Sequence, residues 1–221
     1  GYDVAHWHVI PNAIDPGRYH PDETKRASIR RSLDIDDDQF VIGAVGRNVP
    51  EKGFPDLIAA FAHILHGSAP DEQSRYVLVI VGRGITVEAS SFKTLLDSYK
   101  IPESSVRLLG ARDDVPDVMN SFDLFVMSSI SESFPNVLAE AMATALPCIS
   151  TDVGDCAAVL SDQNLIVPPR TPEALADAIL KLKARSKEQR AATGAQNRAR
   201  IIKNYAPDQM INAFDRAFER S

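Results

Sequence analysis

Two carboxylates, Glu132 and Glu140, stand eight positions apart in a stretch that is otherwise uncharged. Glu140 is the only charged residue between Phe134 and Ile149, where the pattern predicts a helix. A lone carboxylate on an apolar helix is costly unless another group pairs with it. The backbone N–H groups at the start of such a helix form a ready anion site. The pattern therefore indicates an anionic ligand with one glutamate beneath it and the other beside it.

These two glutamates also have a simpler interpretation. Glu140 would then complement the helix dipole in an early turn, and Glu132 would be a solvated loop charge. The residue types by themselves favour this simpler interpretation, and the rest of the chain shifts the balance toward a ligand site.

Two cations, Arg47 and Lys52, lie in a loop bracketed by Gly46 and Gly53. Glycine lets the backbone approach a ligand closely. Arginine offers phosphate a planar fork, and lysine offers a mobile point charge. With the predicted helix start at 134–137 opposite, the two cations would form a diphosphate clamp. The alternative is that both are ordinary surface cations, as most Lys and Arg residues are.

Short apolar strands alternate with helices along the chain. This alternation is typical of βαβ units, so we expect a single Rossmann-like α/β domain with a parallel sheet of about six strands and helices on both faces. The predicted strands are 40–45, 76–81, 106–109, 122–127, 147–150 and 165–167. The predicted helices are 23–33 with Asp22 as its cap, 55–66, 86–99, 115–120, one entered through Pro135 and Asn136, 172–183, 187–203 and 207–220, while 67–74 is expected to be a polar loop.

The expected strand order places both candidate loops together. Right-handed crossovers and the common order 3-2-1-4-5-6 put the topological switch point between strands one and four. Strand one leads into 46–53, and strand four leads into 128–136. Ligands of such sheets bind outside the carboxyl ends of the strands at that point. The charged loops therefore meet where a ligand is expected.

Composition excludes several classes of function. The chain has 221 residues and a net charge of -6, which argues against nucleic acid as a partner. No apolar run approaches the ~20 residues of a membrane span. Cys148 and Cys156 match no metal spacing, and we expect them to be reduced and structural. The acidic run at 36–38 reads as a solvated turn, and neither a P-loop nor a complete G-x-G-x-x-G occurs.

The loop 46–53, GRNVPEKG, and the segment 132–143, ESFPNVLAEAMA, resemble the C-terminal half of retaining glycosyltransferases of the GT-B fold. The family is the large "glycosyl transferases group 1" family, also called family 4. The likeness runs from 9–15, VIPNAID, which is similar to the inter-domain segment of the family, to 152–154 and 167–169. It therefore covers most of the chain.

The resemblance implies a role for each charged residue. Arg47 and Lys52 would bind the donor diphosphate and stabilise charge on the leaving nucleotide. Glu140 would accept hydrogen bonds from the ribose hydroxyls, and Glu132 would contact the donor sugar. The implied donor-binding residues are Gly46, Arg47, Lys52, Gly82, Gly84, Gly110, Ala111, Arg112, Glu132, Ser133, Phe134, Pro135, Asn136, Val137 and Glu140, with Arg47, Lys52 and Glu132 as the catalytic ones.

The same resemblance implies an activity and a setting. The family transfers a sugar from a nucleotide diphosphate with retention and without a metal or other cofactor. We expect a UDP or GDP donor carrying a hexose-type sugar, and a glycan or lipid-linked acceptor bound by an N-terminal domain. This chain would be the cytoplasmic donor half, not catalytic alone, in a protein at the inner face of a membrane. An epimerase-like relative or a non-catalytic nucleotide-binding module is the alternative.

Two parts of the chain sharpen this expectation. Residues 1–22 would be the inter-domain segment, and packing or linker roles are expected for His6 and His8 within it. Residues 207–221 would form the C-terminal helix. Its apolar stripe, Met210, Ile211, Phe214 and Phe218, is expected to pack largely on its own domain. Ser133 departs from the family, which more often has glycine there. Serine restricts positive φ, so a slightly different loop is expected.

Overall fold

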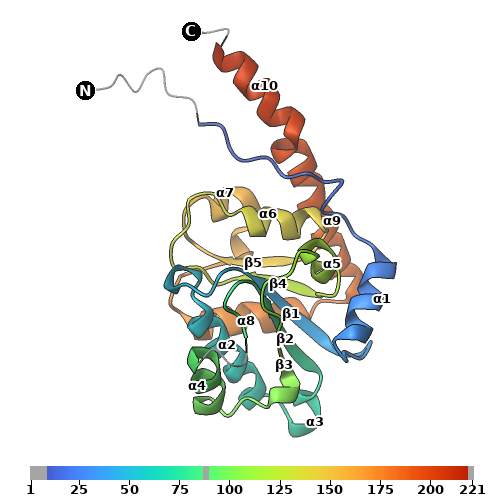
Figure 1. Cartoon of the computed structure of the whole chain (residues 1–221), viewed down its shortest axis with the longest axis vertical. Coiled ribbons are helices and arrows are strands. Elements are labelled where there is room, and N and C mark those ends of the chain that lie inside the picture. The colour runs from blue at the N-terminus through green and yellow to red at the C-terminus, as the bar shows by residue number, and fades with distance from the viewer. Residues whose placement is uncertain (1–8, 87–89, 219–221) are drawn as a thin grey trace, which may run out of the picture.

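A six-stranded parallel sheet forms the centre of the computed structural model, which describes residues 9–86 and 90–218 (Figure 1). Its order is β3-β2-β1-β4-β5-β6, with every neighbouring pair parallel, so the predicted order is confirmed. The central strands are buried on both faces, which explains their continuous apolar sequences. The strands are β1 Phe40–Val45, β2 Tyr76–Val81, β3 Val106–Leu108, β4 Leu124–Met127, β5 Cys148–Thr151 and β6 Ile166–Val167.

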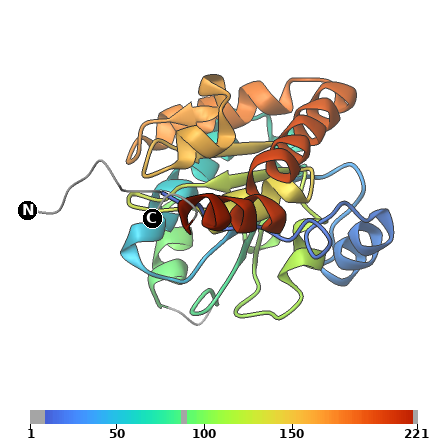
Figure 2. The ribbon, with the colours of Figure 1, turned by 90° about the horizontal axis from the view of Figure 1, so that it is seen from above.

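Helices cover both faces of this sheet (Figure 2). Helix α2 packs against α8, α6 against α9, and α1 against α5. They are α1 Glu23–Ser32, α2 Phe54–Gly67, α3 Pro70–Gln73, α4 Ser90–Ser98, α5 Val115–Met119, α6 Asn136–Ala143, α7 Cys156–Leu160, α8 Pro172–Lys183, α9 Lys187–Tyr205 and α10 Pro207–Phe218. Single 3-10 turns occur at Pro50–Lys52, Glu103–Ser105 and Gln163–Leu165.

Most predicted elements agree with the structure, and the differences have local causes. Asp22 caps α1 as predicted, because its side chain accepts a hydrogen bond from the Lys25 N–H at 3.0 Å. Strand β4 begins at Leu124, two residues later than the predicted 122–127. Asp123 does not continue the strand, because its carboxylate turns back and accepts the Val41 N–H at 2.7 Å. Helices α3 and α7 were not predicted, since four or five residues carry too little periodicity. Part of the predicted helix 86–99, at 87–89, lies outside the described residues.

The C-terminal helix departs most from expectation. Helix α10 extends away from the body of the domain (Figure 1), and none of its described side chains is buried. Ile211, Phe214 and Phe218 are 53%, 45% and 75% exposed. The prediction that this domain covers most of the stripe is therefore wrong. The helix touches the rest of the described chain chiefly at α9, so nothing in that part covers its outer face.

Two smaller predictions can also be compared. Both cysteines are free and buried, as predicted. No helix in the described part of the chain is long and apolar enough to cross a membrane. His6 and His8 lie outside the described residues.

Candidate functional site

The loops that follow β1 and β4 interlock at the carboxyl end of the sheet. The Ile130 N–H donates to the Glu51 carbonyl at 2.8 Å, and the Ser128 hydroxyl donates to the Lys52 carbonyl at 3.0 Å. Gly53 has a φ of +61°, and a Cβ there would lie 2.0 Å from the Ser128 carbonyl oxygen. Only glycine allows this contact. The two loops that the sequence placed at the switch point are therefore held together by backbone contacts.

The loops after β2 and β3 join the same assembly. Gly82 has a φ of +150°, and a Cβ would lie 1.8 Å from the Gly46 carbonyl oxygen. The Gly82 N–H donates to the Gly110 carbonyl at 2.7 Å, and the Asn48 side chain donates to the Gly84 carbonyl at 3.2 Å. The four glycines predicted for the site thus lie in one connected group of loops.

Lys52 and Glu132 form an ion pair in this crevice, and the Ser129 hydroxyl donates to the same Glu132 oxygen at 2.8 Å. The two charged side chains are only 20% and 14% exposed, respectively. The Arg47 side chain is exposed and forms no hydrogen bond or ion pair within residues 9–86 and 90–218. The crevice therefore holds one cation fixed by a carboxylate and a second cation left for an outside partner. Such a pair of cations suits a diphosphate.

Helix α6 presents its N-terminus beside these loops. Pro135 was expected at the first helical position but is the N-cap residue, so the helix begins one residue later, at Asn136. No described side chain caps this end. Its first N–H groups therefore suit an anion, as expected for 134–137. Ser133 does not take positive φ, and its carbonyl accepts the Asp155 N–H at 3.1 Å. Serine thus fits this loop without backbone strain.

Glu140 has a different partner from the one that the sequence analysis could name. The carboxylate is half-buried, and this burial raises its pKa, while the Tyr19 hydroxyl and the Arg18 charge act to lower it. In turn, burial and the neighbouring Glu140 raise the pKa of Tyr19 to about 12. Glu140 forms neither a hydrogen bond nor an ion pair with Lys52 or Glu132. Sequence reasoning missed Tyr19, because it lies beyond the matched segment 9–15 and carries no motif.

In the third predicted loop, Gly110 to Arg112, only backbone groups form hydrogen bonds with the neighbouring loops of the crevice. The Gly110 N–H donates to the Ile85 carbonyl at 2.7 Å. The Arg112 guanidinium forms a fork on Asp114, with contacts of 2.7 and 2.6 Å, which lowers the pKa of that carboxyl. An approach of this loop to ribose and base remains a prediction.

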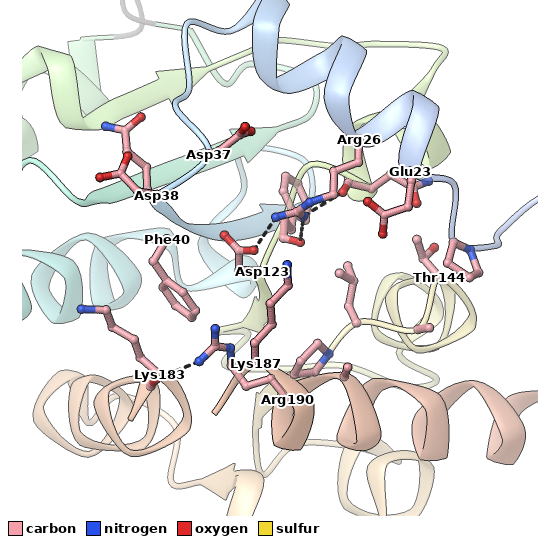
Figure 3. Close-up of a pocket in the computed structure, with 18 residues that line it drawn as sticks. Glu23, Arg26, Asp37, Asp38, Phe40, Asp123, Thr144, Lys183, Lys187 and Arg190 are labelled. Carbon is pink, nitrogen blue, oxygen red and sulfur yellow. Dashed lines mark hydrogen bonds and ion pairs between the residues drawn. The ribbon is translucent and has the colours of Figure 1, made fainter. Parts of the chain in front are cut away.

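A cavity of about 500 Å³ lies elsewhere, at the amino ends of β1, β4 and β5 (Figure 3). Its central carboxylate, Asp123, is bound by Arg26 at 2.6 Å, by Arg30 at 3.2 Å and by the Val41 N–H at 2.7 Å. These charges hold the fold together. The acidic turn at 36–38 lies on the rim of this cavity with exposed side chains, in keeping with the prediction of a solvated turn.

The sequence model of the family "Glycosyl transferases group 1" matches residues 39–185, which include both charged loops. This chain belongs to that family. The predicted resemblance is thereby confirmed.

This group 1 chain is similar to several curated bacterial proteins. It is 32% identical to the "putative teichuronic acid biosynthesis glycosyltransferase TuaC" of Bacillus subtilis, over 81% of this chain and 41% of that protein. It is 31% identical to a "UDP-Gal:alpha-D-GlcNAc-diphosphoundecaprenol alpha-1,3-galactosyltransferase" of Escherichia coli, over 66% and 36%. The "lipopolysaccharide core biosynthesis mannosyltransferase LpsB" of Rhizobium meliloti is 27% identical over 96% and 60%. This chain thus spans roughly a third to three fifths of these relatives' lengths.

Solved structures identify the part of the fold that the group 1 chain represents. Anabaena HepE in complex with UDP superposes with a TM-score of 0.84 at 22% identity, over 97% of this chain and 57% of that one. A "C-terminal domain of glycosyl transferase group 1 family protein (LpcC)" from Francisella tularensis gives 0.73 at 20% identity, over 88% and 99%. The fold is therefore that of the C-terminal half of a GT-B glycosyltransferase, as predicted.

Proposed function

We propose that this group 1 chain is the nucleotide-sugar-binding half of a retaining glycosyltransferase that uses no metal. The observation that carries the proposal is the crevice at the carboxyl ends of β1 and β4. There Glu132 fixes Lys52, the Arg47 side chain has no partner in the part of the chain that the structure describes, and the start of α6 lacks a side-chain cap. These groups together offer a diphosphate two cations and a set of backbone N–H donors.

The proposed chemistry is electrostatic. A nucleoside diphosphate leaves the sugar as an anion, and groups that are stronger partners for that anion than for the bound donor lower the barrier. Arg47 and Lys52 are assigned this role. Glu132 holds Lys52 in place and lies where the sugar would be carried, and Glu140 is assigned to the ribose hydroxyls. The donor is proposed to be a UDP- or GDP-hexose.

The acceptor is assigned to another part of the protein. Matched proteins include the undecaprenol-linked galactosyltransferase and TuaC, so we propose a glycan or lipid-linked acceptor. Met210 and Ala213 of α10 and the segment at 9–13 line a cavity of about 270 Å³. The other apolar side chains of the helix, Ile211, Phe214 and Phe218, are exposed in the described chain. We assign this surface to contact with the acceptor-binding half, and the complete enzyme to the face of a membrane.

Calorimetric titration of this chain with UDP, GDP and ADP, in the presence of EDTA, tests the proposal. One nucleotide should bind, and Lys52→Ala should weaken it roughly ten- to hundredfold, because a charged diphosphate contact contributes about 1.5–3 kcal/mol. Lys181→Ala, which removes an exposed cation on α8, is the matched control and should leave the affinity unchanged.

Two results would contradict this proposal. Equal weakening by Lys52→Ala and Lys181→Ala would remove the crevice as the diphosphate site. Binding that disappears with EDTA would remove the metal-free assignment. With the acceptor-binding half present, transfer of hexose with inversion at the anomeric carbon, read by NMR of the product, would exclude the retaining assignment.

A further inference from the structure

The segment 12–19 lies along one face of α6. The Asn12 side chain donates to the Asn136 side-chain oxygen at 3.1 Å, at the first residue of the helix. The Tyr19 hydroxyl faces Glu140 one turn later. Further along, Arg198 connects this segment to Ala143. Positions 136, 140 and 143 share one helix face because they are four and three residues apart.

Arg198 of α9 fixes the segment against the helix. Its guanidinium donates to the Tyr19 carbonyl at 2.8 Å, to the Pro16 carbonyl at 3.2 Å and to the Ala143 carbonyl. A cation at the last turn of a helix is also favoured by the helix dipole. The backbone of Tyr19 is therefore tied to the same helix that carries Glu140.

Helix α9 itself is locked onto the turn that follows α6. A Cβ at Gly194 would lie 1.9 Å from the Ala145 carbonyl oxygen, so the two backbones are in direct contact. The Asn197 side chain donates to the Leu146 carbonyl at 2.9 Å and is 7% exposed. Consequently, Arg198 cannot shift relative to α6 without breaking close packing.

Tyr19 is only 9% exposed, and its hydroxyl lies next to the Glu140 carboxylate. A tyrosine hydroxyl donates one hydrogen bond, whereas a carboxylate can accept about four. Tyr19 can thus orient Glu140 and still leave acceptor positions for a ligand. No other charged residue lies on α6. The charge of Arg18 on the segment acts on Glu140, and Arg198 on α9 contacts the Ala143 carbonyl of the same helix.

We propose that Tyr19 is a positioning residue for the nucleotide site: it holds the Glu140 carboxylate in the orientation that receives the ribose hydroxyls. This inference rests on the proposed function, in which Glu140 binds the ribose. Arg198 in turn holds Tyr19. Selection of a ribonucleotide over a deoxyribonucleotide would then depend on residues outside the family-matched range 39–185.

The binding test compares UDP with 2′-deoxy-UDP, or GDP with 2′-deoxy-GDP if guanosine is the base that binds. Tyr19→Phe should weaken the ribonucleotide about fivefold and leave the deoxynucleotide unchanged, because it removes one hydrogen bond behind the hydroxyl-binding carboxylate. Tyr99→Phe, at an exposed tyrosine, is the matched control and should change neither affinity. Glu140→Gln should remove most of the preference for the ribonucleotide.

A loosened fold would give a different pattern. Equal weakening of both nucleotides by Tyr19→Phe, with the preference intact, would show a merely structural tyrosine and overturn the inference. A wild-type chain that binds nucleotide with no preference for ribose would overturn it as well.

A second readout needs no nucleotide. In a carbon-13 NMR titration of the Glu140 carboxyl, Tyr19→Phe should raise the pKa, because it removes a hydrogen bond that favours the charged form. An unchanged pKa would overturn the positioning role. If no nucleotide binds the wild-type chain, the proposed function fails, whereas this titration still decides whether Tyr19 positions Glu140.

Discussion

The two ends of the sheet both carry clusters of charged residues, but they use those charges differently. At the amino end, Arg30 is 3% exposed and donates to the Asp36, Gln39 and Ser121 carbonyls at 2.5, 2.7 and 3.2 Å. At the carboxyl end, Arg47 is exposed and has no such partner in the described chain. Charge at the amino end is committed to the backbone, whereas charge at the carboxyl end is available to a ligand.

This difference teaches that the size of a cavity does not locate the site. The amino-end cavity of about 500 Å³ (Figure 3) is large enough for a small ligand. Its central carboxylate nevertheless already has three partners, Arg26, Arg30 and the Val41 N–H. The carboxyl-end crevice is marked instead by glycines where loops touch, by the Arg47 side chain, which has no partner among the described residues, and by a helix start without a side-chain cap. Uncommitted polar groups are therefore the better guide to function here.

The largest expected effect tests the amino end. Asp123→Ala leaves Arg30 buried without its carboxylate and the Val41 N–H without its acceptor. We expect the free energy of unfolding to fall by about 3–5 kcal/mol, measured by urea denaturation. Asp37→Ala removes an exposed carboxylate from the rim of the same cavity and should change it by less than about 0.5 kcal/mol.

The nucleotide affinity of folded Asp123→Ala protein should equal that of the wild type. A selective loss of affinity in that variant would mean that the amino-end cavity belongs to the binding site. It would contradict the claim that the charges at this end serve only stability.

The reverse pattern is expected for Arg47→Ala at the carboxyl end. Nucleotide diphosphate should bind roughly tenfold or more weakly, because a charge-assisted contact is lost. The free energy of unfolding should stay within about 0.5 kcal/mol, since the side chain is exposed and unpaired. Arg31→Ala on α1 is the matched control for both measurements. A large loss of stability in Arg47→Ala would show that this arginine is structural after all.

The smallest effect concerns Glu140. Burial raises its pKa in the folded chain, so protonation favours the folded state. This contribution is complete below the unfolded pKa and is lost as the pH rises through the folded value. At neutral pH the wild type therefore carries a charge that weakens the fold, and Glu140→Gln should be more stable by up to about 1 kcal/mol.

That gain should shrink as the pH falls toward 4, which a set of urea titrations across pH can follow. A stability difference that is independent of pH would mean that the Glu140 charge is not the cause.

Much of the framework could be predicted from the sequence. The strand order followed from alternating apolar runs, and the bounds of β1 and β2 agree with those of the structure. Lys52 and Glu132 were placed at the same crevice, although their direct ion pair was not foreseen. Local pattern is enough for these features because each strand and its following loop are continuous in sequence.

The long-range pairs could not be predicted in the same way. Tyr19 and Glu140 lie far apart in sequence and carry no shared motif, and the same holds for Arg30 and Asp123. Their contacts arise when α1, α6 and α9 pack on the sheet, so tertiary structure alone brings them together. The exposed stripe of α10 was misjudged for a related reason: periodicity identifies an apolar face but not the surface that covers it.

The most direct test of the account is amide hydrogen exchange, followed by mass spectrometry, with and without the nucleoside diphosphate that binds best. We predict slower exchange in 46–53 and 128–140 on binding, and no change in 183–191 at the amino-end cavity. Protection confined to 183–191 would contradict the central claim that the carboxyl end of the sheet binds the nucleotide.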